Sequence, residues 1–205
     1  MAKIKLTKGE LKKQRDALKQ YQRYLPTLLL KKQQLQLEIL QQSALADEKR
    51  SLLNKKKESV KAWAGLFSEP VPGLKEWLVP KSVAVGKKNV AGVNLPVFER
   101  VDFVEADYDL FLTPLWVDFA VDALKGIISQ EIETETIEKG ITILRQELRI
   151  TTQRVNLFEK VKIPETEEAI RLIKIYIGDQ MSNAVGRSKI AKRKIEESML
   201  EEVAV

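Results

Sequence analysis

The sequence predicts a mainly α-helical protein: a long antiparallel two-helix coiled coil with a small β-hairpin head inserted between the helices. Apolar residues recur with heptad spacing through the first 67 residues and again through the last 91, as in helices that pack along one seam. Between them, the segment 68–114 contains five of the seven prolines and a stretch of strand-like alternation. We therefore expect three parts, residues 1–67, 68–114 and 115–205, with the first and third forming one structural unit.

The N-terminal helix is predicted from two series of residues spaced seven apart, the first apolar except at Lys32 and the second mixed. The series are Leu11, Leu18, Leu25, Lys32, Ile39, Ala46, Leu53, Val60 and Phe67, and Gln14, Tyr21, Leu28, Leu35, Gln42, Lys49, Lys56 and Trp63. Thr7 and Glu10 have the spacing of a capping box, which marks the helix start. Pro26 removes a backbone donor inside the pattern, so we expect a kink near Tyr24–Leu25 or a break there.

The middle region is predicted to form the hairpin. The proline-rich segment 69–73 ends the first helix. We interpret Gly86–Asn89 as the turn, because valines flank it on both sides. Residues 93–103 alternate with a period of two, as a strand does, and Pro96 is expected at an edge or a bulge.

The second helix is predicted to begin with Thr113 as the N-cap and Pro114 in the first turn. Its apolar face continues the seam through Trp116, Phe119, Ala120, Ala123, Ile127, Ile137, Ile141, Leu144, Leu148, Val155, Phe158, Ile170, Ile173, Ile177, Met181, Ala184, Ala191 and Ile195. Because this helix is the longer one, we expect its surplus at the start, where it would pack on the hairpin or on another partner. Glycines at 126, 140, 178 and 186 indicate either close packing against the partner helix or a helix that is easily deformed, and the sequence leaves both open.

Composition argues against common catalytic chemistry. The chain has no cysteine and no histidine, which excludes disulfides, Cys–His and Ser–His pairs and the usual zinc ligands. The acidic run Glu105, Asp107 and Asp109 suggests a metal site, but no further ligand cluster supports it and a solvated loop is expected. We therefore predict no catalytic, cofactor-binding or metal-binding residues. No apolar run is long enough for a membrane span, and the N-terminus shows no secretory signal.

The positive charge is concentrated in the first helix. Residues 1–66 carry 16 Lys/Arg and 6 Asp/Glu, a net charge of +10, whereas residues 67–115 and 116–205 each carry −2. Antiparallel pairing would bring Lys61 and the lysines before it close to the glutamates at 131–138. It would also bring two basic groups together at the far tip, namely Lys8, Lys12, Lys13 and Arg15 with Arg187, Lys189, Lys192, Arg193 and Lys194. Such a tip is poorly explained by the hairpin alone. It indicates an acidic partner, either a protein collar or a nucleic acid, or it serves only to keep the tip in solution, and these residues are the candidate partner-binding surface.

Two stretches resemble the D subunit of the V-type (vacuolar/archaeal) ATPases. The first is Leu6–Leu11 followed by Leu28–Lys32, and the second, more specific one is Gln153–Pro164. The family typically shows Arg-Arg-Val-Asn-Ala-Leu-Glu leading to Ile-Pro in the second stretch. Here Gln153 replaces the first arginine and Leu157-Phe158 replaces Ala-Leu, and Gln33-Gln34-Leu35 stands where a Lys-Arg-Asp run is usual.

The resemblance implies a non-catalytic rotor axle. Such a protein transmits torque between a hexamer of A and B subunits, where ATP turns over, and an ion-translocating membrane ring. The implied partners are the A and B subunits, the F subunit of the stalk and the ring adaptor called C or d, with no small-molecule substrate, no nucleic acid and no direct membrane insertion. The implied location is the cytoplasmic face of the membrane. In the matched stretch, Arg154 and Asn156 are candidates either for fixing helix register, which we favour, or for contacting the F subunit.

A prefoldin-like coiled-coil chaperone is the alternative reading, since it also combines an antiparallel coiled coil with hairpins. Such chaperones hold clients through apolar residues at the coiled-coil tips, whereas the predicted tips here are basic. A coiled-coil nucleic-acid binder ranks lower, because the lysines are not interleaved with aromatic residues that could stack on bases.

Overall fold

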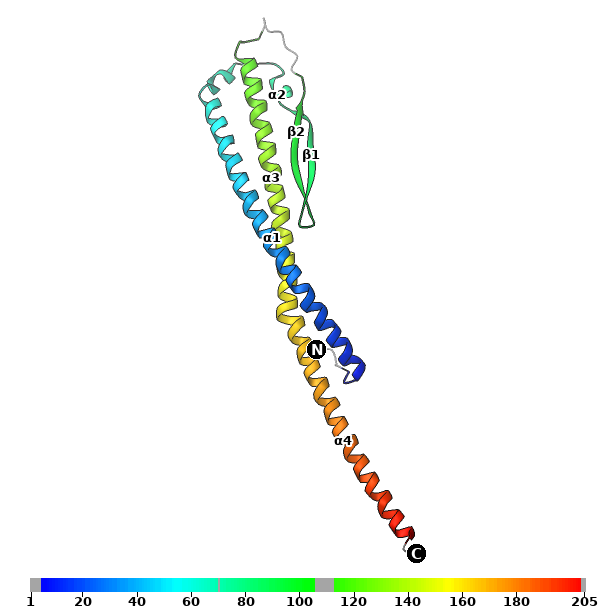
Figure 1. Cartoon of the computed structure of the whole chain (residues 1–205). Coiled ribbons are helices and arrows are strands. Elements are labelled where there is room, and N and C mark those ends of the chain that lie inside the picture. The colour runs from blue at the N-terminus through cyan, green and yellow to red at the C-terminus, as the bar shows by residue number, and fades with distance from the viewer. Residues whose placement is uncertain (1–4, 70, 106–112, 204–205) are drawn as a thin grey trace. The chain divides into compact units, whose positions relative to one another are not determined.

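The computed structural model describes residues 5–69, 71–105 and 113–203, and it confirms the predicted fold class (Figure 1). Helix α1 (Lys8–Lys61) is followed by the 3₁₀ turn η1 (Ala64–Ser68) and the short helix α2 (Leu74–Trp77). Strands β1 (Pro80–Val90) and β2 (Val93–Phe103) form an antiparallel hairpin. Helix α3 (Val117–Leu157), the π-helical turn η2 (Phe158–Lys162) and helix α4 (Ile163–Val203) complete the chain. Two compact units result, residues 30–152 and residues 1–29 with 153–205.

The heptad pattern of α1 corresponds to its burial. Every residue of the first predicted series is buried or half-buried, and in the second series only Lys56 is exposed. The Thr7 hydroxyl accepts a hydrogen bond from the Glu10 amide at 3.2 Å, as predicted for a cap. The Glu10 carboxylate instead accepts from Gln14 Nε2 at 2.9 Å. The helix continues through Pro26, so the outright break, which was the alternative to a kink, does not occur, and the kink stays a prediction.

The first helix ends earlier than predicted, at Lys61 rather than near Phe67. The Trp63 amide donates to the Val60 carbonyl, three residues back, which tightens the chain into the 3₁₀ turn. This turn places the Phe67 ring 5.3 Å from the ring of Trp63 and 5.6 Å from that of Trp116. The aromatic contacts join the end of α1 to the start of the second long helix.

The start of α3 differs from the prediction in two ways. The helix begins at Val117, and Pro114 lies before it. The Pro114 carbonyl accepts a hydrogen bond from the Val117 amide at 3.0 Å. Phe119 is 78% exposed, while Val117 and Val121 are buried instead. Of the rest of the predicted face, Ala120 and Ile127 are buried and Trp116 and Ala123 are half-buried, so Phe119 is the member that the structure places differently.

Paired helices form the core of the unit 30–152. Leu53 and Val60 of α1 are buried with Ile127 of α3. Ion pairs accompany this seam, Lys49–Glu133 at 2.7 Å, Lys57–Glu131 at 3.1 Å and Lys31–Glu147 at 2.8 Å, and Arg50 pairs with Glu138. The predicted opposition of lysines and glutamates is confirmed. The start of α3 is thus paired with the end of α1, and the prediction that it is surplus is wrong.

The hairpin turn lies at Ala91–Gly92, not at the predicted Gly86–Asn89, which is part of β1. Both turn residues have positive φ, 50° and 79°, as a two-residue turn of the primed type requires. Asn89 supports the turn, since its Oδ1 accepts from the Gly92 amide at 3.2 Å. Glycine is tolerated in the strand at position 86 because the Glu99 side chain fills the space that a Cβ would need.

Pro96 lies opposite Lys87 in the hairpin. Because Val90 and Val93 flank the two-residue turn as a hydrogen-bonded pair and the pairs alternate, Lys87 and Pro96 form a non-hydrogen-bonded pair. The missing proline donor therefore disturbs no ladder bond. In a two-stranded sheet each strand is an edge, as expected for Pro96. The two register shifts of the hairpin lie elsewhere, between Pro80 and Ser82 and between Ala84 and Val85.

The hairpin lies alongside α3 (Figure 1). Val93 and Leu95, next to its turn, are buried with Leu35 of α1 and Leu144 of α3. At the other end of the hairpin, Lys125 of α3 lies 5.8 Å from the Phe103 ring centre. The hairpin is consequently packed along the helix pair over much of its length.

In the other unit, the first part of α1 packs against the end of α3 and the start of α4. The rings of Tyr21 and Phe158 lie 5.3 Å apart, and Val155, Ala169, Ile170 and Ile173 are buried. Pro164 explains the π-helical turn before it, because a proline lacks an amide donor and its ring clashes with the carbonyl four residues back. The Ile163 amide donates to the Phe158 carbonyl, five residues back.

Candidate subunit interface

The second half of α4 presents a continuous helical face without a neighbour in the described chain. From Gly178 to Met199 every residue is exposed, whereas Ile173 is fully buried and Ile177 half-buried. Met181, Ala184, Ala191 and Ile195 continue the heptad seam that pairs with α1 nearer the start of α4. Met181 and Ile195 are each 55% exposed. The seam therefore extends beyond its partner helix, and the predicted pairing of these four residues with α1 is wrong.

The same segment carries one of the two predicted basic groups. Arg187, Lys189, Lys192, Arg193 and Lys194 are all exposed. Lys192 and Arg193 lie 3.8 Å and 3.5 Å from Glu196 and Glu197, one helical turn on. Among the described residues no ion pair involves Arg187, Lys189 or Lys194. This segment, residues 178–199, combines an apolar seam with exposed positive charge, and we call it the free segment of α4.

The other basic group lies at the start of α1 and is not brought to the free segment. Lys8, Lys12, Lys13 and Arg15 are exposed. Since Tyr21 faces Phe158, the antiparallel pairing sets Lys8, 13 residues earlier, opposite about residue 171. Arg187 is then roughly 16 residues farther along, about 24 Å at 1.5 Å per residue. The predicted single basic tip is wrong, because α1 begins too late to reach the end of α4.

Arg154 and Asn156 are exposed on either side of Val155, which is 2% exposed and faces the helix pair. A polar residue that fixes register must lie in the seam, so the exposed position of Asn156 does not support that role. Val155 occupies the seam position. The alternative, contact with another protein of the stalk, stays a prediction for both residues.

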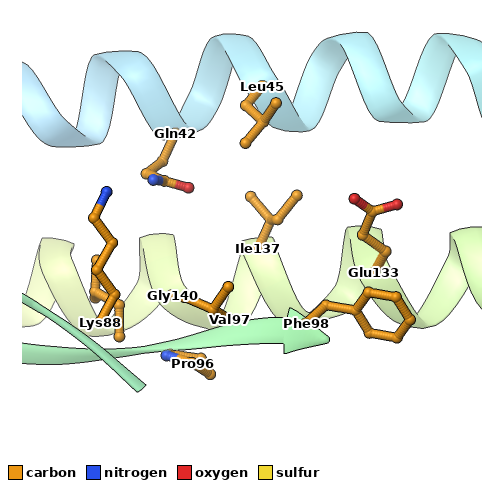
Figure 2. A pocket seen from close by; sticks show the side chains of 10 residues that line it. Gln42, Leu45, Lys88, Pro96, Val97, Phe98, Glu133, Ile137 and Gly140 are labelled. Carbon is orange, nitrogen blue, oxygen red and sulfur yellow. The ribbon is translucent and has the colours of Figure 1, made fainter. Parts of the chain in front are cut away.

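A shallow groove lies between α1, α3 and β2, and sequence reasoning missed it. It encloses about 240 Å³ and is lined by Gln42 and Leu45 of α1, Ile137 and Gly140 of α3, and hairpin residues including Pro96 and Phe98 (Figure 2). Its charged groups are Lys88 and Glu133, and Glu133 is engaged by Lys49. Gly140 lines the groove but was no signal of it, because a Cβ there would make only an ordinary contact with Pro96 Cδ at 3.9 Å.

One ion pair on α4 shifts the pKa values of both its members. The Arg171 guanidinium donates to the Glu168 carboxylate at 2.7 and 2.8 Å, which lowers the pKa of Glu168 and raises that of Arg171 on an exposed helix face. Within residues 5–69, 71–105 and 113–203, no three acidic side chains are grouped so as to hold a metal ion. Asp107 and Asp109 of the acidic run lie outside the described residues.

Comparison with known proteins identifies the family. The family model of the ATP synthase D subunit matches residues 10–193. The chain belongs to this family. A protein of Borreliella burgdorferi, named as the D subunit of a V-type ATP synthase, is 47% identical over 94% of this chain and 95% of its own length. Proteins of the same name from Chlamydia trachomatis and Chlamydia pneumoniae are 33% and 35% identical, each over more than nine tenths of both chains.

Membership of this family makes the chain a component of a V-type ATPase, associated with ATP synthesis and ion transport. The comparisons confirm the resemblance drawn from the stretch Gln153–Pro164, and the fold shows that this stretch contains the π-helical turn. None of the helices, over their described residues, has a stretch apolar enough and long enough to span a bilayer.

Proposed function

We propose that this protein is the central-stalk rotor axle of a V-type ATPase and transmits torque between the A/B hexamer and the membrane ring. The observation that carries the proposal is the free segment of α4. Its 22 residues leave the coiled coil as one exposed helix with an uncovered seam and five basic side chains. A lone helix with an apolar stripe is stable when a surrounding protein covers it. A collar of A and B subunits would do so.

The charges and asymmetry of the free segment suit a turning shaft. At 100° per residue the five basic side chains of the free segment point to several sides of the helix, so its positive charge is not confined to one face. As the three catalytic sites close in turn, each closure favours one shaft angle. Exposed basic side chains on the helix would interact with acidic collar groups over a range of angles, because long flexible cations need no single geometry. In this proposal ATP turns over in the hexamer and the chain itself catalyses nothing.

The remaining assignments follow from the same role. The contacts with A and B would involve the basic groups at Lys8–Arg15 and at Arg187–Lys194. The F subunit would bind elsewhere on the coiled coil, with Arg154 and Asn156 as candidates, and the adaptor C or d would link the stalk to the ring. The complex would lie on the cytoplasmic face of the membrane.

The test is reconstitution with the purified A and B subunits of the same organism. We expect one chain to co-elute with each A/B hexamer and to change its ATPase rate. Absence of co-elution at low salt would reject the rotor proposal and would leave the prefoldin-like chaperone, which an assay of client aggregation would then examine.

Charge-reversal variants locate the contact. Arg187→Glu with Lys189→Glu replaces two exposed cations of the free segment, so we expect weaker capture by the hexamer and a smaller dependence on salt. Arg145→Glu with Arg149→Glu, two exposed cations on α3, is the matched control and should leave capture unchanged. Equal loss in both variants would assign the effect to net charge rather than to the free segment.

A further inference from the structure

Helix α4 begins in a seam that is displaced by one residue. In α3 the seam has spacings of three and four, and its buried or half-buried members are Ile141, Leu144, Leu148, Thr151 and Val155. Continued without interruption, this heptad pattern would place residues 158, 162, 165, 169, 172 and 176 in the seam. After η2 the members of the seam are instead Thr166, Ile170, Ile173 and Ile177, each one position later, although Ala169 is buried as well. The chain therefore contains one residue more than the heptad repeat needs.

The π-helical turn η2 absorbs this surplus residue. A hydrogen bond to the carbonyl five residues back encloses one residue more than an α-helical bond does, and the Ile163 amide donates such a bond to the Phe158 carbonyl. Pro164 follows directly and has no amide donor with which to continue an α-helical ladder. Where the seam resumes, the buried Thr166 donates its hydroxyl to the Lys162 carbonyl at 2.8 Å. The turn thus holds α4 at the angle at which Thr166, Ile170, Ile173 and Ile177 lie in the seam, and we call these four residues the first set.

A second apolar set lies one position earlier along α4. It consists of Ala169, Leu172 and Tyr176, and the last two are each 40% exposed. If η2 were a regular α-helix, every residue after it would turn by about 100° around the helix axis, and the second set would take the place of the first. The first set contains three isoleucines, whereas the second brings Glu165 into the seam with it. The first set is therefore the more apolar, which agrees with its burial in the structure.

We infer that η2 and the two sets form a register switch with two positions. In the position that the structure shows, η2 is a π-helical turn and the first set faces α1. In the other position η2 is α-helical, the second set faces α1, and α4 is turned by about 100° around its axis together with the basic side chains of the free segment. Each position buries one apolar set and an intermediate angle buries neither fully, so the helix has two stable angles. The switch belongs to the chain alone and does not rest on the proposed function.

Two variants drive the switch in opposite directions. Deletion of Lys160 removes the surplus residue, so an α-helical η2 then keeps the first set in the seam and the second position is lost. Pro164→Ala restores an amide donor and favours an α-helix through η2, and with it the second position. Pro26→Ala is the matched control for the substitution, because it restores a donor inside α1 and leaves η2 unchanged. Deletion of Lys139, an exposed lysine within α3, is the control for the deletion.

Because the chain has no cysteine, introduced thiols report which set is covered. Ile173→Cys and Leu172→Cys, one from each set, are placed in every variant of the full chain and labelled with a maleimide dye, and circular dichroism confirms that the helices are intact. In Pro164→Ala we expect labelling at position 173 to be faster by roughly tenfold or more and labelling at position 172 to be slower, with Pro26→Ala unchanged. Deletion of Lys160 should keep position 173 protected and leave the urea midpoint undiminished. Deletion of Lys139 should lower that midpoint, because it turns part of the seam away from α1.

Unchanged labelling at both positions in Pro164→Ala would overturn the switch. So would a loss of stability on deletion of Lys160 as large as that on deletion of Lys139, because the chain would then hold no surplus residue. Where Ile173→Cys itself unfolds the chain, spin labels at the exposed positions Lys19→Cys and Lys174→Cys replace it. Pro164→Ala should shift the distance between the two labels, and a distance unchanged by this substitution would equally overturn the inference.

Discussion

At the scale of single residues, identical side chains on α1 have opposite surroundings. Leu35 is fully buried against Val93, Leu95 and Leu144, while Leu40 is 72% exposed five residues later. Both are leucines in the same helix, so they share helix propensity and differ in contacts alone. Truncating Leu35 should therefore cost more free energy of unfolding than truncating Leu40, because it removes a buried side chain and leaves a cavity.

Leu35→Ala should lower the free energy of unfolding by about 2–5 kcal/mol, because it leaves a cavity between α1, the hairpin and α3. Leu40→Ala should change it by less than about 0.5 kcal/mol. Urea unfolding followed by circular dichroism measures both. Similar losses for the two variants would mean that the hairpin does not pack on Leu35 in solution.

The turn glycine is a second case at this scale. Gly92 has φ of 79°, and an added Cβ would meet nothing within 4 Å, so the cost of a side chain is purely one of backbone conformation. Gly92→Ala should destabilise the chain by about 1–2 kcal/mol. Gly9→Ala, in the first turn of α1 and equally open, should be neutral or slightly stabilising. Thermal unfolding of the two variants and the unchanged chain measures both effects. If Gly92→Ala does not lower the melting temperature, the two-residue turn is contradicted.

At the scale of elements, helix α4 contains glycines that packing does not explain. A Cβ built on Gly178 or Gly186 meets no atom within 4 Å, and the same holds for Gly126 in α3. At Gly140 the nearest contact is an ordinary one with Pro96. Close packing, one of the two readings left open by the sequence, therefore finds no support at Gly178 and Gly186. Flexibility of the free segment, the other reading, stays a prediction.

Gly178→Ala and Gly186→Ala should each stabilise α4 locally by about 0.5–1 kcal/mol, since alanine loses less conformational entropy in a helix. Amide hydrogen exchange of residues 178–190 in the free chain should slow by roughly fourfold or more in the double variant. If flexibility of the free segment is needed for rotation, the double variant should also partly uncouple ATP hydrolysis from ion transport. Faster exchange in either variant would contradict the structure of this segment.

At the scale of the whole molecule, the pairing of the two long helices has a definite offset. Tyr21 faces Phe158 and Lys57 faces Glu131, so both units are antiparallel with the start of α3 beside the end of α1. The excess length of the second long helix consequently falls at its C-terminal end. This offset creates the free segment, which two helices paired along their full length would lack.

Cysteine pairs can check the offset directly. Tyr21→Cys with Phe158→Cys should be joined efficiently within one chain by a short bismaleimide, because the native rings lie 5.3 Å apart. Leu11→Cys with Ile195→Cys should not be joined, although full-length pairing would place these two positions together. Gel mobility under denaturing conditions separates joined from open chains. Efficient joining of Leu11→Cys with Ile195→Cys would refute the offset.

The sequence alone determined the fold class, the helical seam and the family. Heptad spacing is a local property, so it identifies both long helices and the residues of α1 that are buried or half-buried, from Leu11 to Val60. The alternation from Val93 to Phe103 likewise identifies β2. The motif Gln153–Pro164 indicated the family, because a run of residue types can be recognised without knowing how the chain folds.

Tertiary structure decided the features that depend on distance between segments. The turn lies at Ala91–Gly92 rather than at the predicted Gly86–Asn89, because this position lets Val90 and Val93 pack with Leu35 and Leu144. The basic groups at the start of α1 and the end of α4 were separated because the contact of Tyr21 with Phe158 sets how far α1 extends along α4. Register between two helices depends on which side chains meet, and a heptad repeat is compatible with a shift by any whole number of heptads. Only the packed structure could therefore show that α4 extends beyond its partner.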